Sequence, residues 1–128
     1  MVLQENVENQ NWIRLTWKCA FDMRWPKILY AVKAILGTFE NPEVLVGSPG
    51  MGSERVNPAD NPEERELLQL QGKSTHFRGN VSIAFYTNTR QVVINIPKVI
   101  GFSNDYEILS KAVGPFMDTL ELRMFAAK

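Results

Sequence analysis

Gly72-Lys73-Ser74 has the residue types that end a phosphate-binding P-loop. That loop needs a second glycine five residues before Gly72, because backbone amides must wrap closely around the phosphates. Leu67 occupies the position instead. The spacing therefore predicts an ordinary turn at residues 72–74 rather than a nucleotide site.

A second pattern, an acid followed by a strand that ends in acid-x-Lys, is typical of metal-dependent nucleases. There a carboxylate pair holds a metal that activates water, and the lysine steadies the transition state. The sequence has Asp60 followed by Leu70-Gln71-Gly72-Lys73, so Gln71 stands where the second acid is usual. The neighbouring acids favour a solvated surface over an oxygen-rich metal site: Glu63, Glu64 and Glu66.

Two reactive side chains occur once each, because His76 is the only histidine and Cys19 the only cysteine. Neither a Ser–His–Asp nor a Cys–His site can be assigned without a second anchor. Two ligands are also too few for a metal site. We expect no catalytic residue, no bound metal and no cofactor; the patterns favour a protein that is not an enzyme and leave enzyme activity undecided.

Charge is unevenly distributed along the 128 residues, although the formal net charge is zero. Residues 11–36 carry five basic side chains against one acid, and residues 37–72 carry seven acids against two basic side chains. Residues 73–100 carry four basic side chains and no acid. The neutral total hides two basic segments, a distribution that favours an anionic partner.

Composition indicates one globular domain, with 45% apolar and 22% charged residues. A lone cysteine forms no internal disulfide and suits a reducing compartment, so we expect an intracellular protein of the cytoplasm or nucleus. The most apolar stretch, Ile28 to Leu36, is too short to span a membrane. Residues 1–10 are polar and predict a flexible arm before a single domain over residues 11–128.

The first element has apolar and polar side chains in alternation from Trp12 to Phe21, which predicts a half-buried strand. A helix then begins near Asp22 and Pro26 and ends by Gly37 and Asn41-Pro42. Its apolar stripe has helical spacing: Ile28, Leu29, Val32, Ile35, Leu36 and Phe39.

The second half of the chain is dominated by a predicted β-hairpin, Asn80–Tyr86 and Gln91–Ile96 around the turn Thr87–Arg90. Its apolar side chains alternate with polar ones and face one side: Val81, Ile83, Phe85, Val92, Ile94 and Ile96. Before it, the pattern favours a short strand at Glu43–Val46 and a loop over 47–62. Residues 67–71 fit either a strand or a last helical turn.

A last helix is predicted from a cap at Ser103 or Asn104, with a kink at Gly114-Pro115. The resulting fold class is α+β with the order β-α-β-β-β-β-α. The simplest arrangement is a two-layer sandwich, in which both helices cover the apolar face of an antiparallel sheet and the polar face stays open.

The open face collects the candidate binding residues. Cations that pair with phosphates and rings that stack on bases are typical of sheet-type nucleic-acid binders. The alternative is that any open antiparallel face is polar and its cations only maintain solubility. The candidates are Trp12, Arg14, Lys18, Arg78, Tyr86, Arg90 and Lys98.

The element order is similar to one half of the TATA-binding-protein fold, also seen as the amino-terminal domain of type HIII ribonucleases H. The similarity is carried by residues 77–96, a strand, a short turn and a Val-rich strand, followed by the helix from Ser103. The family's Phe-Pro-Gly corner has only Phe77-Arg78-Gly79 as its counterpart, and the wedge phenylalanines have no clear match. The resemblance implies a sheet face that docks on duplex nucleic acid, and one repeat implies a homodimer.

Three functional hypotheses follow from these patterns. The first is a non-catalytic nucleic-acid-binding module that uses the basic open sheet face. The second is a protein–protein interaction or assembly subunit that uses the same face or the Met-rich last helix. The third is a metal-dependent nuclease. None of them requires a membrane.

Overall fold

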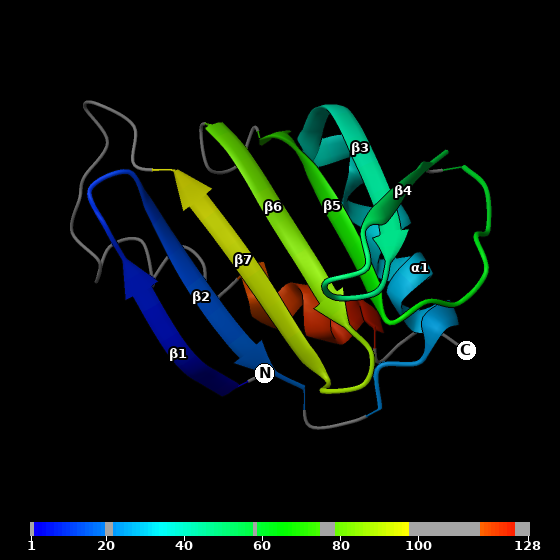
Figure 1. Cartoon of the computed structure of the whole chain (residues 1–128), viewed down its shortest axis with the longest axis horizontal. Helices are drawn as coiled ribbons and strands as arrows, with labels where there is room; N and C mark the ends of the chain where they lie inside the picture. Colours follow the sequence, from blue (N-terminus) through cyan, green and yellow to red (C-terminus); the bar gives the residue numbers. More distant parts are fainter. Residues whose placement is uncertain (1, 20–21, 58, 75–78, 98–115, 125–128) are drawn as a thin grey trace.

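A computed structural model describes residues 2–19, 22–57, 59–74, 79–97 and 116–124 (Figure 1). These residues form an α+β structure with a seven-stranded antiparallel sheet and two helices. The elements are β1 (Val2–Glu8), β2 (Trp12–Lys18), α1 (Trp25–Ile35), a short 3-10 turn (Leu36–Thr38), β3 (Phe39–Gly47), β4 (Ser53–Val56), β5 (Leu67–Ser74), β6 (Gly79–Tyr86), β7 (Gln91–Pro97) and a helix over 116–124. From β2 onward, the predicted order is confirmed if β4 is taken as an added strand.

The strands lie in the order β1-β2-β7-β6-β5-β3-β4, and every neighbouring pair is antiparallel. The predicted β6–β7 hairpin is confirmed, with Ile83 opposite Ile94 and Ser82 opposite Asn95. Its turn ends at Arg90, which has a φ of 55°, the left-handed conformation that closes a tight turn. The hairpin joins β2 on one side and β5 on the other, and so forms the middle of the sheet.

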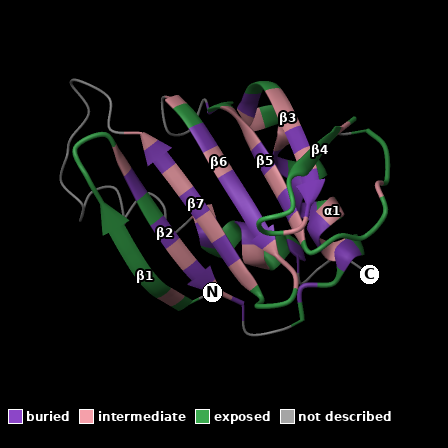
Figure 2. Cartoon of the chain, in the orientation of Figure 1, coloured by how far each residue is buried: buried purple, intermediate pink, exposed green. Residues whose placement is uncertain are grey.

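The core is one cluster of buried side chains, to which the sheet and both helices contribute. Alternate residues of the central strands are fully buried, as the period of two predicts: Ile13, Leu15, Leu68, Leu70, Ile83, Phe85, Val92 and Ile94. Ile28, Val32 and Ile35 of α1 and Met117, Leu120 and Met124 of the last helix belong to the same cluster. Figure 2 shows the purple buried bands that alternate along β2 and β7.

Helix α1 begins with Trp25 and Pro26, as the Pro-in-first-turn pattern predicts. It ends at Ile35, so Phe39 is the first residue of β3 rather than part of the helical stripe. The indole N–H of Trp25 donates a 2.8 Å hydrogen bond to the carbonyl of Pro62, which ties the helix to the loop before β5. No helix among the described residues is long and apolar enough to cross a membrane.

Two segments without an apolar pattern are nevertheless strands. Residues 2–8, expected as an irregular arm, pair along β2 as β1, with a register shift between Leu3 and Glu5. Residues 53–56, expected within a loop, pair with β3 as β4. In both cases backbone pairing to a neighbour defines the strand, while the side chains stay mostly exposed.

The ambiguous segment at 67–71 is also a strand, part of β5 between β3 and β6. Predictions for the cap at Ser103 or Asn104 and the kink at Gly114-Pro115 lie outside the described residues, as do those for Phe21 and His76.

Candidate functional site

The side chains that alternate with the core residues form a second surface of the sheet, which we call the polar face. The strand registers assign them to the side opposite the core. Its members are Val2, Glu5, Val7, Trp12, Arg14, Thr16, Lys18, Glu40, Glu43, Leu45, Gly47, Leu67, Gln69, Gln71, Lys73, Asn80, Ser82, Ala84, Tyr86, Gln91, Val93, Asn95 and Pro97.

Trp12 and Arg14 occupy one end of this face, on β2. The Arg14 guanidinium carbon lies 4.9 Å from the centroid of the Trp12 ring, within the range of a cation–π contact. Arg14 is exposed and Trp12 is half-buried. Among the described residues neither Arg14 nor Lys18 has an acidic partner, so both charges are available to a ligand.

Lys18, Tyr86 and Arg90 lie towards the other end. Lys18 stands opposite Gln91, which in turn stands opposite Tyr86. Six residues of strand separate Trp12 from Lys18, or about 20 Å at 3.3 Å per residue. Arg90 is in the hairpin turn, where its guanidinium lies 4.0 Å from the Asp22 carboxylate. Arg78 and Lys98 are outside the described residues.

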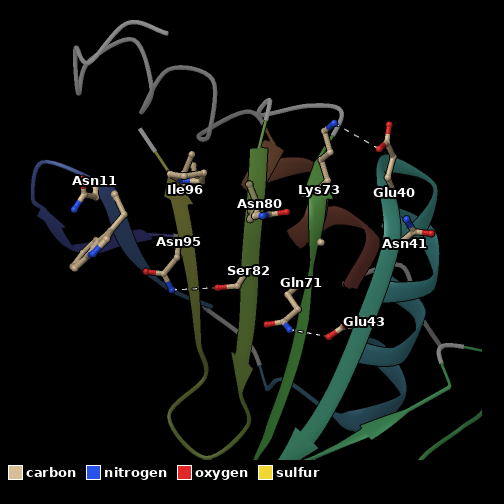
Figure 3. Close-up of a pocket in the computed structure, with 14 residues that line it drawn as sticks. Asn11, Glu40, Asn41, Glu43, Gln71, Lys73, Asn80, Ser82, Asn95 and Ile96 are labelled. Atoms are coloured by element: carbon tan, nitrogen blue, oxygen red, sulfur yellow. Dashed lines mark hydrogen bonds and ion pairs between the residues drawn. The ribbon is translucent and has the colours of Figure 1, made fainter. Parts of the chain in front are cut away.

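A hollow of about 760 Å³ opens on the polar face next to Trp12 (Figure 3). Its lining is rich in carboxamides, and includes two acids and one lysine. The polar and aromatic lining residues are Asn11, Trp12, Glu40, Asn41, Glu43, Gln71, Lys73, Asn80, Ser82 and Asn95.

The strand registers create this lining. They align Arg14, Asn95, Ser82, Gln71 and Glu43 in one row across β2, β7, β6, β5 and β3. Two neighbouring pairs in the row are hydrogen-bonded: Asn95 Nδ2 donates to Ser82 Oγ at 3.3 Å, and Gln71 Nε2 donates to Glu43 Oε2 at 3.0 Å. The floor of the hollow is therefore a cross-strand network of polar groups.

The acids of the hollow are each matched by a cation. The Arg55 guanidinium lies 3.2 Å from Glu43 Oε1, and the Lys73 ammonium lies 3.9 Å from Glu40 Oε2. Both contacts are solvent-exposed and individually weak. Their presence shows that the polar face is mixed in charge, whereas the sequence hypothesis assumed a basic one.

The predicted list missed most of the hollow, including Glu43, Gln71 and Asn80. Glu43 meets Gln71 only through the pairing of β3 with β5, which are distant in sequence, and Asn80 meets Lys73 only through the β5–β6 register, which spacing along one segment does not predict. The one available signal was alternation, which already placed Ser82 and Asn95 on the same side of the hairpin.

The residues of the other chemical hypotheses do not assemble. Asp60 lies beside Leu29, Val32 and Lys33 of α1, whereas Lys73 belongs to the polar face. Within the described ranges, no group of three His, Cys, Asp or Glu residues could hold a metal ion. Asp60 and Lys73 of the nuclease pattern therefore do not line the same pocket in the described part of the chain.

Cys19 is buried at the end of β2. Burial, followed by the nearby Glu121 carboxylate, raises the pKa of its thiol from 9.0 to about 11. Since the thiolate is the nucleophilic form, Cys19 is unreactive at neutral pH.

The methionines in the described part of the last helix face the core rather than a partner. Met117, Leu120 and Met124 are buried in the core cluster. Leu122 is an exposed apolar side chain on the same segment.

Comparison with known proteins gives no relative: no family model, no curated protein and no solved structure matches this chain.

Proposed function

We propose that this protein is a non-catalytic module that binds nucleic acid on the polar face of its sheet. The observation that carries the proposal is the Trp12–Arg14 pair at the rim of a polar hollow. The aromatic ring can stack on a base while the guanidinium beside it, which has no acidic partner, pairs with the phosphate of the same nucleotide. Side-chain amides nearby supply hydrogen bonds to base edges.

The proposal includes the two-layer arrangement predicted from sequence, with both helices on the apolar face. It is supported by the single core cluster, which joins that face to α1 and to residues 116–124. It is also supported by Figure 1, in which both helices are drawn behind the sheet. In this arrangement, neither helix covers the polar face, and a ligand can reach it.

Charge makes the expected binding only weakly dependent on salt. Arg14 and Lys18 are the cations of the polar face that lack an acidic partner among the described residues. Two phosphate contacts on a single strand give a slope of log K against log [salt] of about −1.4. Raising salt from 50 to 200 mM should therefore weaken binding only about sevenfold.

The test is a titration with fluorescent single-stranded and duplex oligonucleotides at 50 and 200 mM salt. The double variant Arg14→Gln/Lys18→Gln should weaken binding and bring the slope close to zero. The matched control, Arg24→Gln/Arg123→Gln, removes the same charge from exposed positions outside the polar face and should retain the slope. Absence of binding to any oligonucleotide at low salt would overturn the proposal.

The resemblance to the TATA-binding-protein fold adds a proposed homodimer, whose two sheets would form one continuous saddle for a duplex. Sedimentation of the protein alone and with duplex measures this directly. A monomer in both conditions would leave the single sheet as the binding unit and exclude the saddle.

A protein partner is the second candidate function, and one observation favours it. Among the strands that the structure describes, β1 pairs with β2 alone, at the end of the sheet. Such end strands accept an added strand from a partner chain.

A further inference from the structure

The polar hollow next to Trp12 has chemistry of its own, and the inference drawn from it rests on the proposed function. Its two acids and one lysine occur as ion pairs, with Arg55 completing the second pair. The described lining therefore holds no spare cation for a phosphate. A neutral ligand with many hydrogen-bonding groups fits the hollow better than an anionic one.

Two of the five lining amides, Gln71 and Asn95, are already hydrogen-bonded to neighbours. Gln71 accepts a 2.9 Å hydrogen bond from Gln69 and donates one to Glu43. Asn95 donates to Ser82, which leaves the Asn95 carbonyl oxygen as an acceptor. These bonds hold the floor of the hollow in place before a ligand arrives, which reduces the entropy lost on binding.

Asn11, Asn41 and Asn80 are the lining amides whose side chains have no hydrogen bond among the described residues, and of these three Asn80 lies on the central β6–β7 hairpin. It is exposed on β6, next to Lys73 of β5, and its carboxamide has no hydrogen-bond partner among the described residues. A free carboxamide presents a donor and an acceptor side by side. That pattern complements the N6/N7 edge of adenine, which pairs with Asn or Gln through two hydrogen bonds.

Trp12 supplies the other contact. β2 and β6 are separated by β7 alone, so their axes lie about 10 Å apart, two strand spacings. A base lying over β7 can stack on the Trp12 ring and direct its edge towards Asn80. Arg14 lies against the same ring, where the phosphate of that nucleotide would be.

We infer that the hollow receives one unpaired base of a single strand, adenine by preference, stacked on Trp12 and held at its N6/N7 edge by the Asn80 carboxamide. The preference for a single strand arises because a base within a duplex is already stacked on both sides and cannot enter. The hollow thus reads the base, while Arg14 holds the backbone.

The experiment compares three twelve-nucleotide single strands, of deoxyadenosine, deoxythymidine and 7-deazadeoxyadenosine, by fluorescence anisotropy. The 7-deaza base replaces the N7 acceptor by C–H and keeps the ring shape, so it removes one of the two bonds to Asn80. Wild-type protein should bind the deoxyadenosine strand about 5- to 160-fold more tightly than Asn80→Ala does. Asn80→Ala should bind the deoxyadenosine and 7-deaza strands equally, because without the carboxamide neither base is hydrogen-bonded at position 7 and the wild-type difference between the two strands disappears.

Asn88→Ala is the matched control, since Asn88 is an exposed asparagine in the turn at the other end of β6. Its affinity for all three strands should equal that of the wild type. If Asn80→Ala fails to fold, Asn80→Asp keeps the side-chain shape but loses the amide donor to N7, and should lose the preference for the deoxyadenosine strand over the 7-deaza strand.

The outcomes separate the two proposals. Binding of all three strands with equal affinity, or an unchanged adenine preference in both Asn80 variants, overturns the adenine site and leaves nucleic-acid binding intact. No binding of any strand to the wild type overturns the proposed function itself.

Discussion

The two faces of the sheet are formed by the same strands, yet they differ in what their side chains do. On β6, Ile83 is fully buried in the core, and its neighbour Ser82 accepts a hydrogen bond on the polar face. On β7, Ile94 and Asn95 show the same contrast. The apolar face is packed and tolerates little change in volume, whereas the polar face is held by cross-strand hydrogen bonds and remains accessible.

The largest expected effect concerns the apolar face. Ile83→Ala should lower the free energy of unfolding by about 2–5 kcal/mol, because it removes buried methyl groups and leaves a cavity. Ser82→Ala, one residue away, should change it by less than about 1 kcal/mol, the usual net value of one hydrogen bond. Urea denaturation of the two variants measures the difference, and equal midpoints would contradict the assignment of the two faces.

Gly47 lies on the polar side of the sheet, but unlike the other residues there it has no room for a larger side chain. It ends β3, and a Cβ atom there would lie 2.4 Å from the carbonyl oxygen of Gly52, which is backbone and cannot simply rotate away. Gly47→Ala should therefore cost about 1–3 kcal/mol through displacement of the β3–β4 turn.

Gly37→Ala is the matched control, since a Cβ at Gly37 meets nothing within 4 Å and the residue has no positive φ. Thermal melts of both variants test the contrast. If Gly47→Ala is as stable as the control, a Cβ at position 47 does not clash with the Gly52 carbonyl oxygen, and the prediction is wrong.

The last expected effect appears only at alkaline pH and concerns Cys19, whose thiol pKa is raised to about 11 by burial. The unfolded chain loses this proton near pH 9.0 and the folded chain only near 11, so the folded state binds more protons between those values. Stability should therefore fall as pH rises from 9 to 11, relative to Cys19→Val. Denaturation curves of both proteins across this range check the sign, and parallel curves would contradict it.

The same contrast between faces explains how far sequence reasoning reaches. β2 and the β6–β7 hairpin were predicted correctly because apolar and polar residues alternate along them, and burial enforces that pattern. β1 and β4 were not, because both are held by main-chain pairing to a neighbour, which leaves no mark on side-chain type.

The candidate site divides in the same way. Trp12 and Arg14 were predicted because they alternate along one strand. The hollow could not be, because Gln71 meets Glu43 across 28 positions of sequence and Asn95 meets Ser82 only through the hairpin register. Such a site depends on register between distant strands, which composition and spacing along one segment do not contain.

The position of β2 in the sheet has a kinetic consequence. β2 lies between β1 and β7, so its residues near the start of the chain must find partners such as Asn95, which pairs with Arg14. A β1–β2 hairpin can form as soon as its own residues are available, but it can join the sheet only after β7 has been synthesised. Contacts of such long sequence range slow folding towards the millisecond-to-second regime. Until β7 is synthesised, the edge of β2 that will pair with β7 is open to pairing with other chains, and the apolar side chains of Ile13 and Leu15 are exposed. Aggregation is therefore most expected in the interval before β7 pairs with β2.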